Sequence, residues 1–180
     1  FEAKTFDGGG SWVGEDVFYL NPVNAVIYPK DGLSHSVEVT LDVPADFLRV
    51  CGKPFDGSRV VFKNYDELYD HPMVASNDLR KFEYSVEGTR FYSWFYGLND
   101  KLWSQEWLSL NTEVFEKFSR AQFELFGSFP FEEFHFITLV PEYSYYHGVE
   151  HLSSTMLVLG PPERVLMKRP KDLWGVASHE

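Results

Sequence analysis

The stretch Tyr145-Tyr-His-Gly-Val-Glu-His-Leu-Ser-Ser-Thr-Met-Leu-Val-Leu-Gly160 gathers two histidines and a glutamate around a glycine before it becomes apolar. Its polar part, 145–154, predicts a loop, because Gly148 and the tyrosines before it show no regular apolar period. The apolar part, 155–159, predicts a strand buried on both faces of a sheet. The stretch therefore predicts polar side chains held at the margin of a buried sheet.

The end of the chain continues this pattern with a predicted helix that begins at Asp172 and carries His179 and Glu180. His-Glu is the first half of the His-Glu-x-x-His motif of zinc peptidases. In that motif two histidines four residues apart bind one ion, and the glutamate takes a proton from metal-bound water. The chain stops before a second histidine, so an ordinary helix end is the alternative reading of these two residues.

Upstream, the pattern predicts a mixture of helix and strand. A helix is expected at 112–126, capped by Asn111 or Thr112 and ended by Gly127. Residues 81–87 and 90–96 alternate around Glu87-Gly88 and predict a hairpin. A further strand is expected at 133–140. These elements predict an α+β arrangement for the second half of the chain.

The N-terminal part reads as antiparallel β-structure. Residues 36–43 alternate between apolar and polar side chains, which is typical of a half-buried strand. The turn-rich segment 65–77 predicts a domain boundary. We therefore expect an antiparallel β-sandwich-like domain at 1–70, incomplete at its start, and a second domain, mostly β with one or two helices, at 71–180.

Composition narrows the choice of partners. The 180 residues carry 16 basic and 27 acidic side chains, a net charge of −11, which disfavours nucleic acid and favours cationic ligands. The single cysteine, Cys51, excludes an internal disulfide framework and leaves the cellular compartment open. No apolar run reaches membrane-spanning length, so no membrane partner is expected.

Two of the candidate site features have alternative readings. Glu150 is either a carboxylate that binds a positively charged substrate group or a loop acid with its own ion pair. His147 and His151 are four residues apart, which would suit a metal pair only if the segment were helical. Glycine and tyrosines argue for a loop there instead.

Three segments together carry a family resemblance: Tyr146-His-Gly-Val-Glu-His151, Ser154-Thr155, and Leu173-Trp-Gly-Val-Ala-Ser-His-Glu180. They resemble the glycyl aminopeptidase family of zinc metallopeptidases, in its Bacteroidetes-type branch. Residues 64–72 are similar to that family's Asp-Tyr-Asp-x-Leu-x-Asp-Ser-Pro segment, from which Asn64 and His71 depart. The resemblance spans about residues 14–180.

This resemblance implies a gluzincin-type aminopeptidase, in which an N-terminal β domain precedes a thermolysin-like catalytic domain. His179 would be the first zinc ligand and Glu180 the general base. Glu150, with Gly148 and His151 in the same motif, would bind the α-ammonium group of a peptide substrate with a free N-terminus.

What we expect of the 180-residue chain in isolation follows from its end at Glu180, inside the zinc motif. One imidazole does not hold zinc tetrahedrally, so we expect zinc in the parent protein, none bound stably here, and no catalysis by this part alone. Open apolar surface at the cut predicts self-association. A non-catalytic β-rich module that binds peptide or carbohydrate, and a purely structural domain, are the competing hypotheses.

Overall fold

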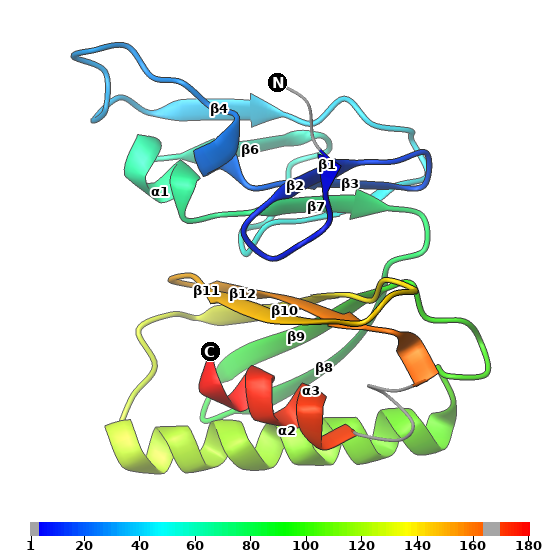
Figure 1. Ribbon diagram of the computed structural model, residues 1–180. Coiled ribbons are helices and arrows are strands. Elements are labelled where there is room, and N and C mark those ends of the chain that lie inside the picture. The colour runs from blue at the N-terminus through cyan, green and yellow to red at the C-terminus, as the bar shows by residue number, and fades with distance from the viewer. Residues whose placement is uncertain (1–3, 164–169) are drawn as a thin grey trace. The chain divides into compact units, whose positions relative to one another are not determined.

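The computed structural model describes residues 4–163 and 170–180, which fall into two compact units divided between Asp78 and Leu79. Strands dominate both units, and the described residues include three α-helices. The predicted α+β class, with a β-rich first part, is therefore confirmed (Figure 1).

The first unit consists of two antiparallel sheets. Its five-stranded sheet has the order β1-β2-β3-β7-β5, and its second sheet pairs β4 with β6. The strands are β1 (Lys4–Thr5), β2 (Ser11–Val13), β3 (Val17–Leu20), β4 (Val37–Thr40), β5 (Leu48–Val50), β6 (Arg59–Phe62) and β7 (Met73–Ser76). Two short helices complete the unit, η1 (Pro22–Asn24) and α1 (Tyr65–Tyr69).

Both sheets of this unit contribute to one core. Val60 and Phe62 from β6 and Met73 from β7 share a buried cluster with Leu68 of α1. The alternation seen in the sequence is present in β4, where Val37 and Val39 are half-buried and Glu38 and Thr40 exposed. Two packed sheets with a shared apolar core are the defining property of a sandwich.

The boundary between the units lies after Asp78 and not after residue 70. The segment predicted as a hinge forms α1 and then β7, whose residues are all buried. Met73 pairs with Leu20, and Val74 pairs with both Tyr19 and Val50, so β7 is an inner strand of the first sheet. The polar residues at 64–70 suggested a linker, because a short capped helix such as α1 contains the same polar residue types as a turn. Asn64 caps it by accepting the Glu67 N–H at 2.8 Å.

His71 follows α1 and is 2% exposed, with its ring 5.3 Å from that of Phe62 and its Nδ1 2.6 Å from the Glu67 carbonyl oxygen. Burial lowers the pKa of His71 in the folded state. Between that pKa and the unfolded value near 6.5, the unfolded chain binds more protons, so the free energy of unfolding must fall as pH falls. We expect a slope of at most about 1.4 kcal/mol per pH unit, measured by denaturant unfolding between pH 8 and pH 5. His71→Asn should flatten the slope, and an unchanged slope would contradict the assignment.

The second unit is a mixed five-stranded sheet of order β11-β12-β10-β9-β8. Its elements are β8 (Arg80–Val86), β9 (Thr89–Tyr96), α2 (Gln105–Phe126), β10 (Glu133–Leu139), β11 (Tyr145–Glu150), β12 (Ser154–Gly160) and α3 (Pro170–His179). β9, β10 and β12 run parallel, whereas β8 and β11 are antiparallel to their neighbours. The predicted hairpin is confirmed, with its two-residue turn at Glu87 and Gly88, both with positive φ.

Helix α2 ends at Gly127 as predicted, but it begins seven residues before Thr112. Ser104 caps it by accepting the Trp107 N–H at 3.2 Å. Asn111, one of the two caps that the sequence suggested, is fully buried inside the helix and donates to the Trp107 carbonyl oxygen at 2.8 Å. An asparagine within a helix is uncommon, and here its position is explained by its contact with α3.

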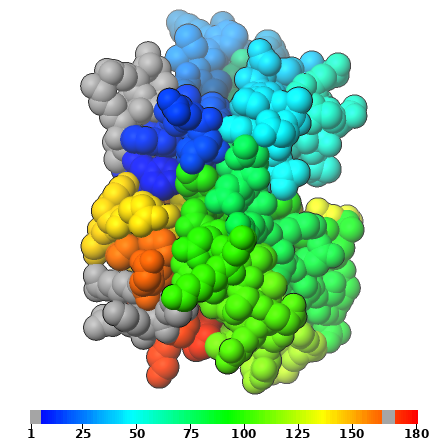
Figure 2. Space-filling view, turned by 90° about the vertical axis from the view of Figure 1, so that its right-hand side faces the viewer, coloured from blue at the N-terminus to red at the C-terminus, as the bar shows by residue number. Residues whose placement is uncertain are grey.

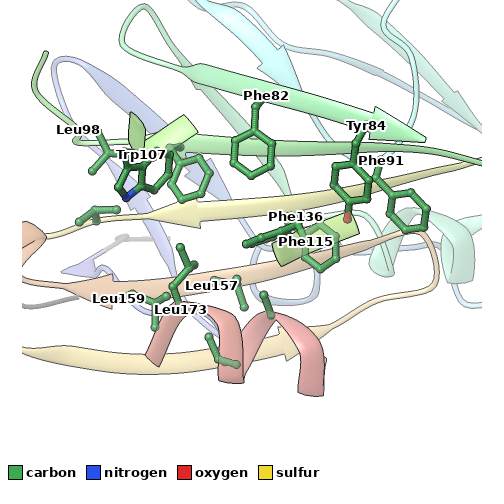
Figure 3. Close-up of a cluster of buried hydrophobic side chains, with 14 of the residues drawn as sticks. Phe82, Tyr84, Phe91, Leu98, Trp107, Phe115, Phe136, Leu157, Leu159 and Leu173 are labelled. Atoms are coloured by element: carbon green, nitrogen blue, oxygen red, sulfur yellow. The ribbon is translucent and has the colours of Figure 1, made fainter. Parts of the chain in front are cut away.

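The core of the second unit lies between the sheet and the two helices (Figure 3). Phe115 of α2 packs its ring against Phe82 of β8 and Phe136 of β10, with ring centroids 5.4 and 5.2 Å apart. Leu173 of α3 joins the same cluster beside Leu157 and Leu159 of β12. The green atoms of residues 80–115 cover most of this unit's visible face in Figure 2. One apolar core thus fixes α3 against the sheet strands that carry the predicted site.

Candidate active site

Residues 145–150 of the polar stretch form an edge strand, β11, so the loop predicted for 145–154 is confined to residues 151–153. Gly148 pairs with Leu157 and Glu150 with Thr155 of the buried strand β12. β11 was missed because only one neighbour covers it, so its outer residues are polar and no apolar alternation marks it. The strand gives its side chains a fixed register that a loop would lack.

Helix α3 carries the other half of the site and is buried through Leu173, Val176 and Ala177. Three hydrogen bonds fix it: Trp174 Nε1 donates to Asn111 Oδ1 at 2.9 Å, Gln122 Nε2 to the Ser178 oxygen at 3.1 Å, and the Tyr146 hydroxyl to the Asp172 oxygen at 3.4 Å. The first two tie α3 to α2, and the third ties it to β11. The Glu180 N–H still donates to the Val176 oxygen at 3.0 Å, so Glu180 continues the helical turn.

Asn111→Ala should lower the free energy of unfolding by about 2 kcal/mol, because it removes two hydrogen bonds of a buried side chain and leaves the Trp174 indole N–H inside the interface. Urea denaturation measures this. Ser109→Ala, on the exposed side of the same helix, is the matched control and should change stability by less than about 0.5 kcal/mol. Equal effects of the two substitutions would contradict the role given to Asn111.

Gly148 lies directly against the Glu180 side chain. A Cβ placed on Gly148 would lie 2.3 Å from Glu180 Oε1 and 2.7 Å from its Cδ, well inside van der Waals contact. The φ angle of Gly148 is not among the positive ones, so this position needs glycine for space and not for backbone conformation. The glycine in the edge strand therefore admits the carboxyl group that follows α3.

Glu180 also makes a side-chain hydrogen bond with Glu150. Partial burial raises the pKa of Glu180, and this hydrogen bond and the Glu150 charge raise it further. The pKa of the exposed Glu150 is lowered, first by its own backbone N–H and then by Glu180. Two neighbouring carboxyl groups titrate as a coupled pair, and the pKa of Glu150 is the lower of the two. Glu150 is thus the member of the pair that ionises first as the pH rises.

Three histidines act electrostatically on the Glu150–Glu180 pair but do not form a metal-binding site with it. His179 and His147 act on Glu180 electrostatically, and His151, which follows β11, acts on Glu150. His147 and His151 do not form a pair for one ion, because four residues of extended chain span about 13 Å. Across residues 4–163 and 170–180, no group of three His, Cys, Asp or Glu side chains could hold a metal ion. The described residues alone therefore do not fit a zinc site, which needs at least three protein ligands.

A cavity of about 270 Å³ adjoins Glu180 on the helix side of the sheet and was not foreseen from the sequence. Its walls are mainly phenylalanines, contributed by β9, α2, the turn after it and β10. The only sequence signal for it is the close spacing of Phe126, Phe129 and Phe131. Within the described residues, no helix is long and apolar enough to cross a membrane.

Comparison with known proteins assigns a peptidase-related fold. Residues 1–77 match the family described as the Peptidase M61 N-terminal domain. The structure is similar to the crystal structure of an aminopeptidase N family protein from Idiomarina loihiensis, with a TM-score of 0.74 and 22% sequence identity. That likeness covers 87% of this chain and 27% of the other, so the chain spans about a quarter of its structural relative. No curated protein matches the sequence.

Proposed function

We propose that this chain is the N-terminal part of a zinc-dependent aminopeptidase and that β11 and α3 form the side of its active site that receives the substrate's N-terminus. The contact between Gly148 and Glu180 carries the proposal, because it brings a motif on an edge strand to the end of a helix 32 positions further along the chain. The family match of residues 1–77 and the similarity in fold to an aminopeptidase support it.

Glu150 binds the α-ammonium group of the peptide. Its carboxylate is exposed and its pKa is lowered, so it stays ionised at neutral pH and offers a charge-assisted hydrogen bond. Peptides whose amino group is blocked lose this bond. The free N-terminus is therefore the feature of the substrate that this site selects, whereas glycine preference rests on the family resemblance alone.

Glu180 is the general base of the proposed reaction. Partial burial and the nearby Glu150 raise the pKa of its carboxyl group, which makes its carboxylate a stronger base. An incoming ammonium group at Glu150 replaces Glu180 as the partner of that carboxylate and frees the Glu180 side chain. His179 would be the zinc ligand among the described residues, and the other ligands would come from elsewhere in the protein. Zinc, when bound, would activate water and polarise the scissile carbonyl group.

The test compares the full-length protein with the 180-residue chain. We expect one zinc per full-length molecule, release of N-terminal residues from free peptides, and no cleavage of N-acetylated ones. Glu180→Gln should abolish turnover with zinc retained, whereas Glu150→Gln should mainly raise KM. The 180-residue chain alone should be inactive.

A full-length protein without zinc or peptidase activity would overturn the proposal and favour the non-catalytic binding module. Cleavage of acetylated peptides as fast as free ones would contradict only the role given to Glu150 and would leave the peptidase proposal standing. The self-association expected of the short chain stays a prediction, which light scattering tests through the mass in solution.

A further inference from the structure

Three tyrosines of the first unit, Tyr28, Tyr65 and Tyr69, form a triad outside the proposed active site. Their ring centroids lie 5.9, 6.1 and 6.2 Å apart, a nearly equilateral triangle. The ring planes are inclined to one another by 49–64°, so no two rings are stacked face to face. A point above such a triangle lies within about 6 Å of all three centroids, the range in which a cation is attracted to an aromatic face.

The triad is held in place by backbone contacts. Tyr65 and Tyr69 are four residues apart on α1 and so share one side of that helix. Tyr28 belongs to an irregular segment that is tied to α1 at both ends. The Tyr69 hydroxyl donates to the Val26 oxygen at 3.2 Å, and the Tyr65 N–H donates to the Leu33 oxygen at 3.1 Å. A ligand would therefore meet rings that are already positioned.

The triad is partly exposed through Tyr28, whereas Tyr65 and Tyr69 are half-buried, and a carboxylate lies close by. Tyr28 is 47% exposed and the neighbouring Ile27 is 90% exposed. Asp66, which follows Tyr65, acts electrostatically on Tyr69, in addition to the effects of burial and of the other two tyrosines. The cation–π contacts found among the described residues use Lys53 and Lys81 on other rings. Negative potential and aromatic faces both favour a positively charged guest.

We propose that the triad of Tyr28, Tyr65 and Tyr69 binds a quaternary ammonium group, such as the trimethylammonium end of a choline-like molecule. Such a cation carries its charge on apolar methyl groups and needs no hydrogen bond. The site offers aromatic rings, and the hydroxyl hydrogen of Tyr69 is donated to the Val26 oxygen. A primary ammonium group is more strongly hydrated and would lose more on entering. This binding is independent of the proposed peptidase activity.

The test titrates the intact chain with choline chloride at constant ionic strength and follows the backbone amides of α1 and residues 26–33 by NMR. The neutral isostere 3,3-dimethylbutan-1-ol has the same shape without the charge. We expect saturable, millimolar binding of choline and at least about 5-fold weaker binding of the alcohol. Tyr28→Leu and Tyr65→Leu should each weaken choline binding about 2- to 5-fold.

Tyr143→Leu is the matched control, because Tyr143 is also about half exposed but lies in the second unit; it should leave binding unchanged. Co-sedimentation with phosphatidylcholine vesicles separates a lipid headgroup from a soluble ligand as the source of the group. Equal binding of choline and the alcohol, or unchanged binding in Tyr28→Leu, would overturn the proposal. Tyr28 lies outside helices and strands, so that variant decides the matter even if Tyr65→Leu fails to fold.

Discussion

Gly148→Ala is expected to reduce the peptidase activity of the full-length protein by about 100-fold or more while the fold survives. The added Cβ would lie 2.3 Å from Glu180 Oε1, so the carboxyl group must move by at least about an ångström. A displacement of that size at a catalytic group is enough for a loss of this order. The atoms displaced are the end of a flexible side chain, so the melting temperature should change little. Turnover of a free peptide, with thermal unfolding in parallel, measures both quantities.

Gly175→Ala is the control for this substitution. It lies on α3, and the nearest atom to its added Cβ is the Tyr146 hydroxyl oxygen at 4.0 Å, an ordinary contact. Activity should stay close to that of the unaltered protein. If Gly148→Ala is as active as Gly175→Ala, then Glu180 does not act from the position seen here, and its role as general base is lost.

Phe115→Ala should lower the free energy of unfolding of the second unit by about 3–5 kcal/mol. Phe115 is completely buried at the middle of α2, and its ring contacts those of Phe82, Phe118 and Phe136. Removing it opens a cavity between the helix and the sheet and loses several aromatic contacts. Urea denaturation followed by circular dichroism gives the change directly.

Leu125→Ala, ten residues along the same helix, is 76% exposed and should cost less than about 1 kcal/mol. A loss for Phe115→Ala as small as for Leu125→Ala would mean that α2 does not pack on the sheet as described. Because α3 joins the same cluster through Leu173, a weakened core should also loosen the helix that carries His179.

Elements that depend on local signals could be predicted reliably. The alternation of Val37 and Val39, the Glu87-Gly88 turn and the stop at Gly127 each depend on residues within one element, and all three are confirmed. The misplaced features depend on distant partners. Asn111 resembles a helix cap until α3 is seen to contact it, and β7 resembles a linker until it is paired between β3 and β5.

The candidate site shows the same division. Gly148, Glu150, His179 and Glu180 could be chosen from their motifs, and their roles stay predictions. Their mutual geometry could not be foreseen, because the edge strand lacks an apolar period and the close approach of Gly148 and Glu180 depends on how α3 packs. The opposite pKa shifts of the two glutamates likewise depend on burial and on their mutual contact, which the sequence does not show.

The parallel arrangement of the central strands has a consequence for the order of folding. The β8–β9 hairpin brings together close neighbours in the chain, whereas the pairing of β9 with β10 joins residues such as Arg90 and Glu133 across the whole of α2, 43 positions apart. Closing that long loop is slow compared with forming a hairpin or a helix. We therefore expect the hairpin and α2 to form early and the parallel pairing to limit the refolding rate. The edge strand β11 joins through β12, so the candidate site would be among the last parts of this unit to take shape.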